Sequence, residues 1–69
     1  MRLSEAIKEK REALGMSQAE LGRSCGVGRS TICRYESEDR KPPYEILKKI
    51  AGVLDIDLKE IDLETIVRD

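Results

Sequence analysis

The sequence has no His, no Trp and no Phe, and only two Tyr among its 69 residues. Without His, the chain lacks the most frequent general base and the most frequent metal ligand. The scarcity of aromatic side chains argues against aromatic cages and against stacking platforms for single-stranded nucleic acid. A domain of this size hides only ~60% of its unfolded surface, which leaves no room for a deep catalytic pocket. We therefore expect no enzymatic activity, no cofactor, no metal and no small-molecule substrate.

Long apolar runs are also missing. None approaches the ~20 residues that a membrane span needs, and the N-terminus lacks the apolar segment of a signal peptide. The two cysteines, Cys25 and Cys33, are too few for a zinc site or for the disulfide framework of a small secreted domain. We expect both to be reduced thiols packed as small residues. These features predict a single soluble domain over residues 1–69, located in the cytoplasm and without a membrane partner.

Charged residues are plentiful and unevenly distributed, although the net charge is only −1. Residues 1–49 hold 11 of the 13 Lys and Arg and 8 of the 14 Asp and Glu, which is a net charge of +3. Residues 50–69 hold the remaining two basic and six acidic residues, which is a net charge of −4. The chain is therefore expected to present one basic face, suited to nucleic acid, and one acidic face.

The spacing of apolar residues predicts an all-α fold of five short helices and no strand. The predicted helices cover residues 3–14, 17–25, 29–36, 44–54 and a last segment that begins at Asp57. Ser17 and Glu20 form a capping-box pattern at the start of the second helix, and Gly26 ends that helix. Asp57 and Glu60 form the same pattern at the start of the last helix.

The second and third helices are joined by a tight turn at Gly26, which is the arrangement of a helix-turn-helix. Gly26 supplies a backbone free to adopt a positive φ, and Gly22 is small where the two helices are expected to cross most closely. On a helical wheel that starts at Arg29, Ile32 and Tyr35 lie at about 300° and 240°, on the side expected to face the core.

The opposite side of the third helix predicts an exposed, acid-free face. On the same wheel Cys33, Ser30 and Arg34 lie at about 40°, 100° and 140°, together with Arg29. This outer face carries two Arg, one hydroxyl and one thiol.

Several short motifs in this region resemble the Cro/repressor (Xre-like) helix-turn-helix family. They are Gln18-Ala19-Glu20-Leu21, Gly26-Val27, Ser30-Thr31-Ile32 and Arg34-Tyr35-Glu36. The resemblance covers residues 3–61 and extends to Lys48-Lys49-Ile50-Ala51 and Leu54-Asp55-Ile56. It implies a compact five-helix, lambda-repressor-like DNA-binding domain of a bacterial or phage-encoded transcriptional regulator, which usually acts as a dimer.

The resemblance also implies roles for individual residues. Contacts to base edges in the major groove are expected from Arg29, Ser30 and Arg34. Contacts to the DNA backbone are expected from Gln18, Gly28, Thr31, Arg40 and Lys41. An ion pair between Arg11 and Glu36 is expected to tie the first helix to the end of the third. A separate hypothesis is that oxidation of Cys33 would place negative charge against the groove.

The loop after the third helix departs from the family pattern. The family often has Asn-Gly-Lys there, whereas this chain has Ser37-Glu38-Asp39. Either Glu38 adopts the left-handed conformation that Gly usually takes, at an energetic cost, or the loop has another shape. The two acids also stand near the expected position of the phosphates, so we expect fewer backbone contacts than usual.

The C-terminal end supplies candidates for a dimer interface. One recognition helix reads only a few base pairs, so pairing is needed for useful specificity. Residues 57–69 are predicted to form the dimerisation end, with Leu54 as an additional contact. The predicted interface residues are Leu58, Ile61, Leu63, Ile66 and Val67. The last three either meet a partner chain or fold back onto their own core.

The sequence therefore predicts a domain that binds double-stranded DNA and regulates transcription, acting as a homodimeric repressor on an inverted-repeat operator. The alternative is an antitoxin-type interaction module that also regulates its own operon. A change in DNA affinity on addition of a toxin would distinguish the second function from the first.

Overall fold

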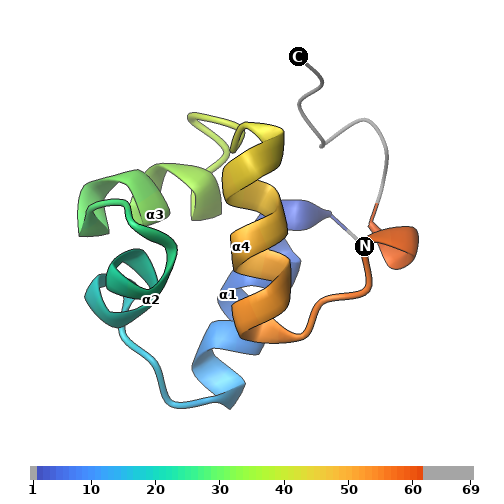
Figure 1. The fold of residues 1–69 in the computed structure, drawn as a ribbon, viewed down its shortest axis with the longest axis horizontal. Helices are drawn as coiled ribbons and strands as arrows, with labels where there is room; N and C mark the ends of the chain where they lie inside the picture. Colours follow the sequence, from blue (N-terminus) through green and yellow to red (C-terminus); the bar gives the residue numbers. More distant parts are fainter. Residues whose placement is uncertain (1, 62–69) are drawn as a thin grey trace.

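The computed structural model describes residues 2–61, which fold entirely as helices and connecting loops (Figure 1). This range holds four α-helices, one short 3-10 helix and no strand. The elements are α1 Leu3–Ala13, α2 Gln18–Cys25, α3 Arg29–Glu36, α4 Tyr44–Leu54 and η1 Leu58–Glu60. The all-α prediction is confirmed, and α3 and α4 have the predicted bounds. The count of five helices is not supported, because the last element in this range is a 3-10 helix of three residues.

Local signals in the sequence set the ends of α2. The Ser17 hydroxyl accepts a hydrogen bond from the backbone N–H of Glu20 at 3.0 Å, and the Glu20 carboxylate accepts one from the Ser17 N–H at 2.9 Å. This is the predicted capping box, and it satisfies two of the N–H groups that a helix start leaves without partners. Gly26 ends the helix with φ 75°, a left-handed conformation that is strained for residues with a side chain.

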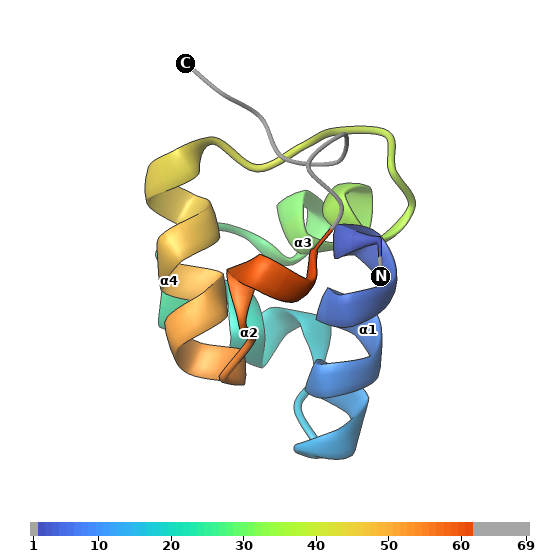
Figure 2. The same ribbon diagram turned by 90° about the vertical axis from the view of Figure 1, so that its right-hand side faces the viewer.

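One hydrophobic core joins all four helices. Its buried members are Leu3, Ala6, Ile7, Leu21, Cys25, Ile32, Tyr35, Leu47, Ile50, Leu54 and Ile61. Every α-helix contributes at least two of these residues, so no helix can be removed without opening the core. The most extensive packing is between α2 and α3, and α1 and α4 lie together on one side of that pair (Figures 1 and 2).

The segment after α4 differs from its prediction. The Asp57 carboxylate accepts a hydrogen bond from the Lys59 N–H at 2.9 Å, so it caps a tight turn instead of opening an α-helix. Directly after this turn, the Ile61 side chain enters the core, where it is only 5% exposed. Leu58 is half-buried and packs against the same core.

These positions correct part of the predicted dimer interface. Ile61 and Leu54 are core residues of their own chain and are not available to a partner. Leu63, Ile66 and Val67 lie outside the described residues. Figures 1 and 2 show η1 on the side of the molecule opposite α2 and α3.

Candidate nucleic-acid interface

The α3 helix turns one face into the core and the other toward solvent, as the wheel predicts. Ile32 is 0% exposed and Tyr35 is 4% exposed. The exposed residues of the helix are Arg29, Ser30, Cys33 and Arg34. The one acid in α3, Glu36, has a side chain that is only 6% exposed and is engaged in an ion pair. The exposed face of α3 is therefore basic, and its fixed orientation comes from the apolar side chains beneath it.

The two cysteines have different environments. Cys25 is buried in the core, and this burial raises the pKa of its thiol. Cys33 is exposed on the outer face of α3. The expectation of a packed small residue is therefore right for Cys25 and wrong for Cys33, because Cys33 lies on the side of α3 away from the core.

Arg11 of α1 and Glu36 of α3 form a largely buried ion pair. The Arg11 Nε donates to Glu36 Oε2 at 2.7 Å, and Arg11 Nη2 donates to Glu36 Oε1 at 3.1 Å. Arg11 Nη1 also donates to the Met16 carbonyl at 2.8 Å. The hydrogen bond to Glu36 is the main cause that raises the pKa of Arg11. One guanidinium therefore fastens α1 both to the end of α3 and to the chain just before α2.

Gln18 joins this pair at the first residue of α2. Its side-chain amide nitrogen donates to Glu36 Oε1 at 3.2 Å. The start of α2 is thus fixed relative to the end of α3 through a single carboxylate. The sequence did not indicate this contact, because the two residues are 18 positions apart and no local pattern joins them. An amide nitrogen carries two hydrogens, so the Gln18 amide has a donor besides the one bound to Glu36.

The backbone at Glu38 shows which of the two expected shapes the loop after α3 adopts. It has φ 66°, so it occupies the left-handed conformation in which the family usually has Gly. The loop is also tied to the helix, since the Arg40 N–H donates to the Arg34 carbonyl at 3.3 Å. The Ser37 hydroxyl donates to the same carbonyl at 3.2 Å. The loop therefore keeps a defined shape without the glycine.

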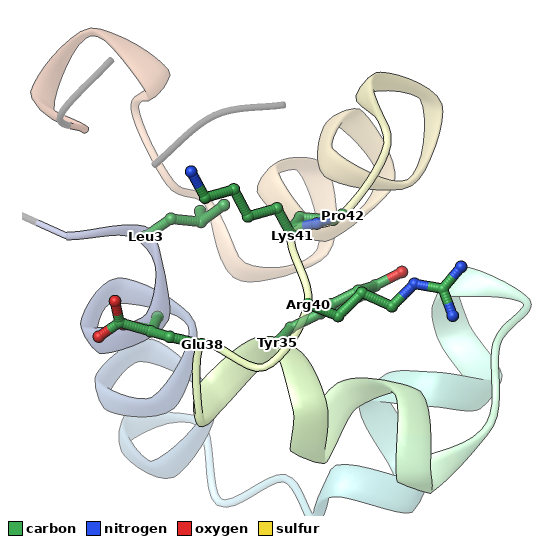
Figure 3. A pocket seen from close by; sticks show the side chains of 7 residues that line it. Leu3, Tyr35, Glu38, Arg40, Lys41 and Pro42 are labelled. Atoms are coloured by element: carbon green, nitrogen blue, oxygen red, sulfur yellow. The ribbon is translucent and has the colours of Figure 1, made fainter. Parts of the chain in front are cut away.

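The side chains of this loop point in different directions. Figure 3 shows Glu38 directed toward α1, whereas the Arg40 guanidinium extends the other way. Arg40 and Lys41 are both exposed, and Pro42 is buried. The loop residues border a small hollow of about 40 Å³ next to Leu3 and Tyr35 (Figure 3). This volume is far below the ~300 Å³ at which small-molecule pockets begin.

The remaining predicted backbone contacts lie at the start of α3. Gly28 is exposed and forms the N-cap of the helix in an extended conformation, without a side-chain cap. Thr31 is half-buried one turn further along. The structure therefore brings the predicted DNA contacts onto α3, its two flanking loops and the first residue of α2. The predicted dimer residue Leu58 lies on the opposite side.

The sequence matches the helix-turn-helix family model over residues 7–61. This range includes α2, α3 and the turn between them. The chain belongs to the Cro/C1-type, Xre-like helix-turn-helix family. It is thus a DNA-binding domain of the kind found in transcription regulators.

Three proteins that are named as transcription regulators are similar to this chain over most of its length. A Methanocaldococcus jannaschii protein, named as an HTH-type transcriptional regulatory protein, is 41% identical over 58 residues, which is 83% of this chain and 18% of that protein. A Methanococcus vannielii protein of the same name is 42% identical over 53 residues, which is 77% of this chain and 16% of that protein.

The third relative is the cryptic phage CTXphi transcriptional repressor RstR of Vibrio cholerae. It is 31% identical over 61 residues, which is 88% of this chain and 54% of RstR. The chain therefore spans about half of RstR and less than a fifth of the two methanogen proteins. No solved structure gives a significant match to the chain.

Residues 2–61 contain neither a candidate membrane span nor a candidate metal-binding group of side chains. No helix in this range has the length and apolar character of a membrane span. Within the same range, no three His, Cys, Asp or Glu side chains are grouped so that they would hold a metal ion.

Proposed function

We propose that this chain binds double-stranded DNA sequence-specifically and regulates transcription by placing α3 in the major groove. The observation that carries the proposal is the exposed, acid-free face of α3, where Arg29, Ser30 and Arg34 lie opposite the side that is buried in the core. A guanidinium matches the two acceptors that guanine presents in the major groove, so the two arginines are the main base readers. Ser30 contributes a hydroxyl that donates to or accepts from a base edge.

Contacts to the phosphates fix the register of this helix on the duplex. We assign these contacts to Gln18, at the first residue of α2, and to the exposed Arg40 and Lys41, in the loop after α3. Gly28 and Thr31 add contacts at the start of α3. We assign no catalytic role to any of these residues, because their chemistry is that of hydrogen-bond donors and fixed positive charges.

We further propose a homodimeric repressor that works by occupying an operator. Two inverted half-sites about 34 Å apart would place two recognition helices in successive major grooves of one DNA face. The named repressor function of RstR supports the sign of regulation and fits a bacterial or phage-encoded origin. The pairing surface is the side that carries η1, with Leu58 and the segment containing Leu63, Ile66 and Val67.

The DNA-binding proposal is tested by selecting duplexes from a random pool and titrating the protein against the selected sequence. A preferred inverted repeat and an affinity that falls with salt, with about 3–5 phosphates neutralised per subunit, are expected. Recovery of random sequence, or an affinity that does not change with salt, would exclude the proposal.

The dimer is tested separately by sedimentation of the protein with Asp in place of both Ile66 and Val67. We expect this variant to fold as a monomer and to lose affinity for the inverted repeat. If its stoichiometry on DNA equals that of the wild type, the C-terminal segment is not the pairing surface.

A further inference from the structure

Arg2 and Glu38 form an ion pair between the start of α1 and the loop after α3. The Arg2 Nη2 contacts Glu38 Oε1, and Arg2 Nε donates to Glu38 Oε2 at 3.2 Å. The two residues are 36 positions apart and both side chains are about half exposed. The hydrogen bonds from Arg2 are the first cause that lowers the pKa of Glu38, with Ser4 and Lys41 adding to it. The carboxylate is therefore ionised at neutral pH.

This carboxylate belongs to the loop that also carries the proposed phosphate contacts. Glu38 is two residues before Arg40 and three before Lys41. A carboxylate close to the phosphates would repel them and offset part of what the two basic residues contribute. In the structure Glu38 is directed toward α1, away from the side to which Arg40 extends (Figure 3). The Lys41 side chain extends toward Leu3 instead, and its charge adds to the lowering of the pKa of Glu38.

The backbone conformation of Glu38 determines where its side chain points. Glu38 has φ 66°, a conformation that is unfavourable for a residue with a side chain. In this left-handed turn the side chain lies beside α1, where Arg2 pairs with it. The family pattern usually places Gly at this position, and Gly has no side chain to direct.

We propose that Arg2 is a positioning residue for DNA binding: it holds the Glu38 carboxylate away from the phosphates and neutralises its charge. The inference rests on the proposed DNA-binding function. It assigns to Arg2 an indirect electrostatic role, in which Arg2 acts on the DNA through Glu38 and makes no contact with a phosphate or a base. Glu38 is the residue whose charge would otherwise weaken binding.

The test compares the affinities of the wild type, Arg2→Ala, Glu38→Gln and the double variant for the selected duplex. The salt concentration is about 0.1 M, where the Debye length is ~10 Å. Arg2→Ala is expected to weaken binding about two- to fivefold, the range of an exposed charge pair. Glu38→Gln is expected to bind at least as tightly as the wild type, because the repelling charge is gone. The double variant is expected to bind like Glu38→Gln.

Lys10→Ala is the matched control, because it removes one exposed positive charge from α1, the helix whose N-cap is Arg2. An effect of Arg2→Ala no larger than that of Lys10→Ala overturns the inference. A loss in Arg2→Ala that Glu38→Gln does not restore also overturns it, since Arg2 would then touch the DNA directly. If the wild-type protein selects no duplex, the proposed DNA-binding function itself is excluded. If the wild type binds but the variants give either of the two results just described, only the role of Arg2 is excluded.

Discussion

The backbone of Val27 lies directly against Gly22. A Cβ added at Gly22 would stand 2.6 Å from the Val27 carbonyl oxygen and 3.1 Å from the carbonyl group of Gly28. The Val27 N–H in turn donates to the Gly22 carbonyl at 2.8 Å. The small residue in the middle of α2 is therefore required by the turn that leads into α3. The sequence predicted a close approach at Gly22 but attributed it to the crossing of the two helices.

Gly22→Ala is expected to lower the free energy of unfolding by about 1–3 kcal/mol, the usual cost of forcing extra volume into a packed site. The obstructing atoms are backbone, so they move only if the turn moves. Urea denaturation measures this loss.

Gly52→Ala is the matched control, because Gly52 lies within α4 and a Cβ there would meet nothing within 4 Å. It is expected to raise stability by about 0.5–1 kcal/mol through helix propensity alone. If Gly22→Ala stabilises the protein as much as Gly52→Ala does, the account of the turn is wrong.

The Glu20 carboxylate links stability to pH. The hydrogen bond from the Ser17 backbone is the first cause that lowers the pKa of Glu20 below its ordinary value of 4.5. A carboxylate with a lowered folded-state pKa contributes stability above its unfolded-state pKa and loses it as the pH falls through the folded-state value. The free energy of unfolding is therefore expected to decrease as the pH is lowered below about 4.5.

Glu20→Gln keeps an oxygen acceptor for the Ser17 N–H but removes the titrating group. Denaturation curves between about pH 3 and pH 6 are expected to show a shallower acid dependence for this variant. Identical slopes for the variant and the wild type would contradict the role given to the charged capping box.

The ion pair of Arg11 and Glu36 is expected to contribute more to the relative positions of α1, α2 and α3 than to the net free energy of unfolding. Arg11→Met leaves the Glu36 carboxylate buried without its cation, which is expected to cost about 3–5 kcal/mol. Arg11→Met combined with Glu36→Leu leaves neither charge buried and is expected to recover most of this loss.

The double variant also removes the group that holds Gln18. We therefore expect a well-folded protein with reduced DNA affinity, measured by thermal unfolding and by titration of the same samples. A double variant as unstable as Arg11→Met, or one that binds DNA like the wild type, would count against this assignment.

Local chemistry made much of the fold predictable. Ser17 and Glu20 cap α2 as their spacing indicates, and Gly26 takes the positive φ that the turn needs. The wheel also placed Arg29 and Arg34 correctly on the exposed side of α3. Each of these inferences depends on residues within about one helical turn of each other, where sequence spacing fixes geometry.

The errors and omissions arise from contacts distant in sequence. Asp57 caps a 3-10 helix, and Ile61, four residues later, is buried in the core that all four α-helices form. The capping pattern of residues 57–60 contains no information about that burial. The pairing of Arg2 with Glu38 and the hydrogen bond from Gln18 to Glu36 exist only once α1, α2 and α3 are assembled.

The most direct test of the central claim, that the exposed face of α3 reads duplex DNA, is the base preference of Arg34→Ala on the selected sequence. This variant is expected to lose about 1–3 kcal/mol of binding free energy and to relax the preference at one base pair. Lys59→Ala, which removes an exposed positive charge from η1 on the opposite side, is expected to keep the wild-type preference. If Arg34→Ala binds every single-base variant of the duplex as the wild type does, Arg34 does not face the groove and the claim fails.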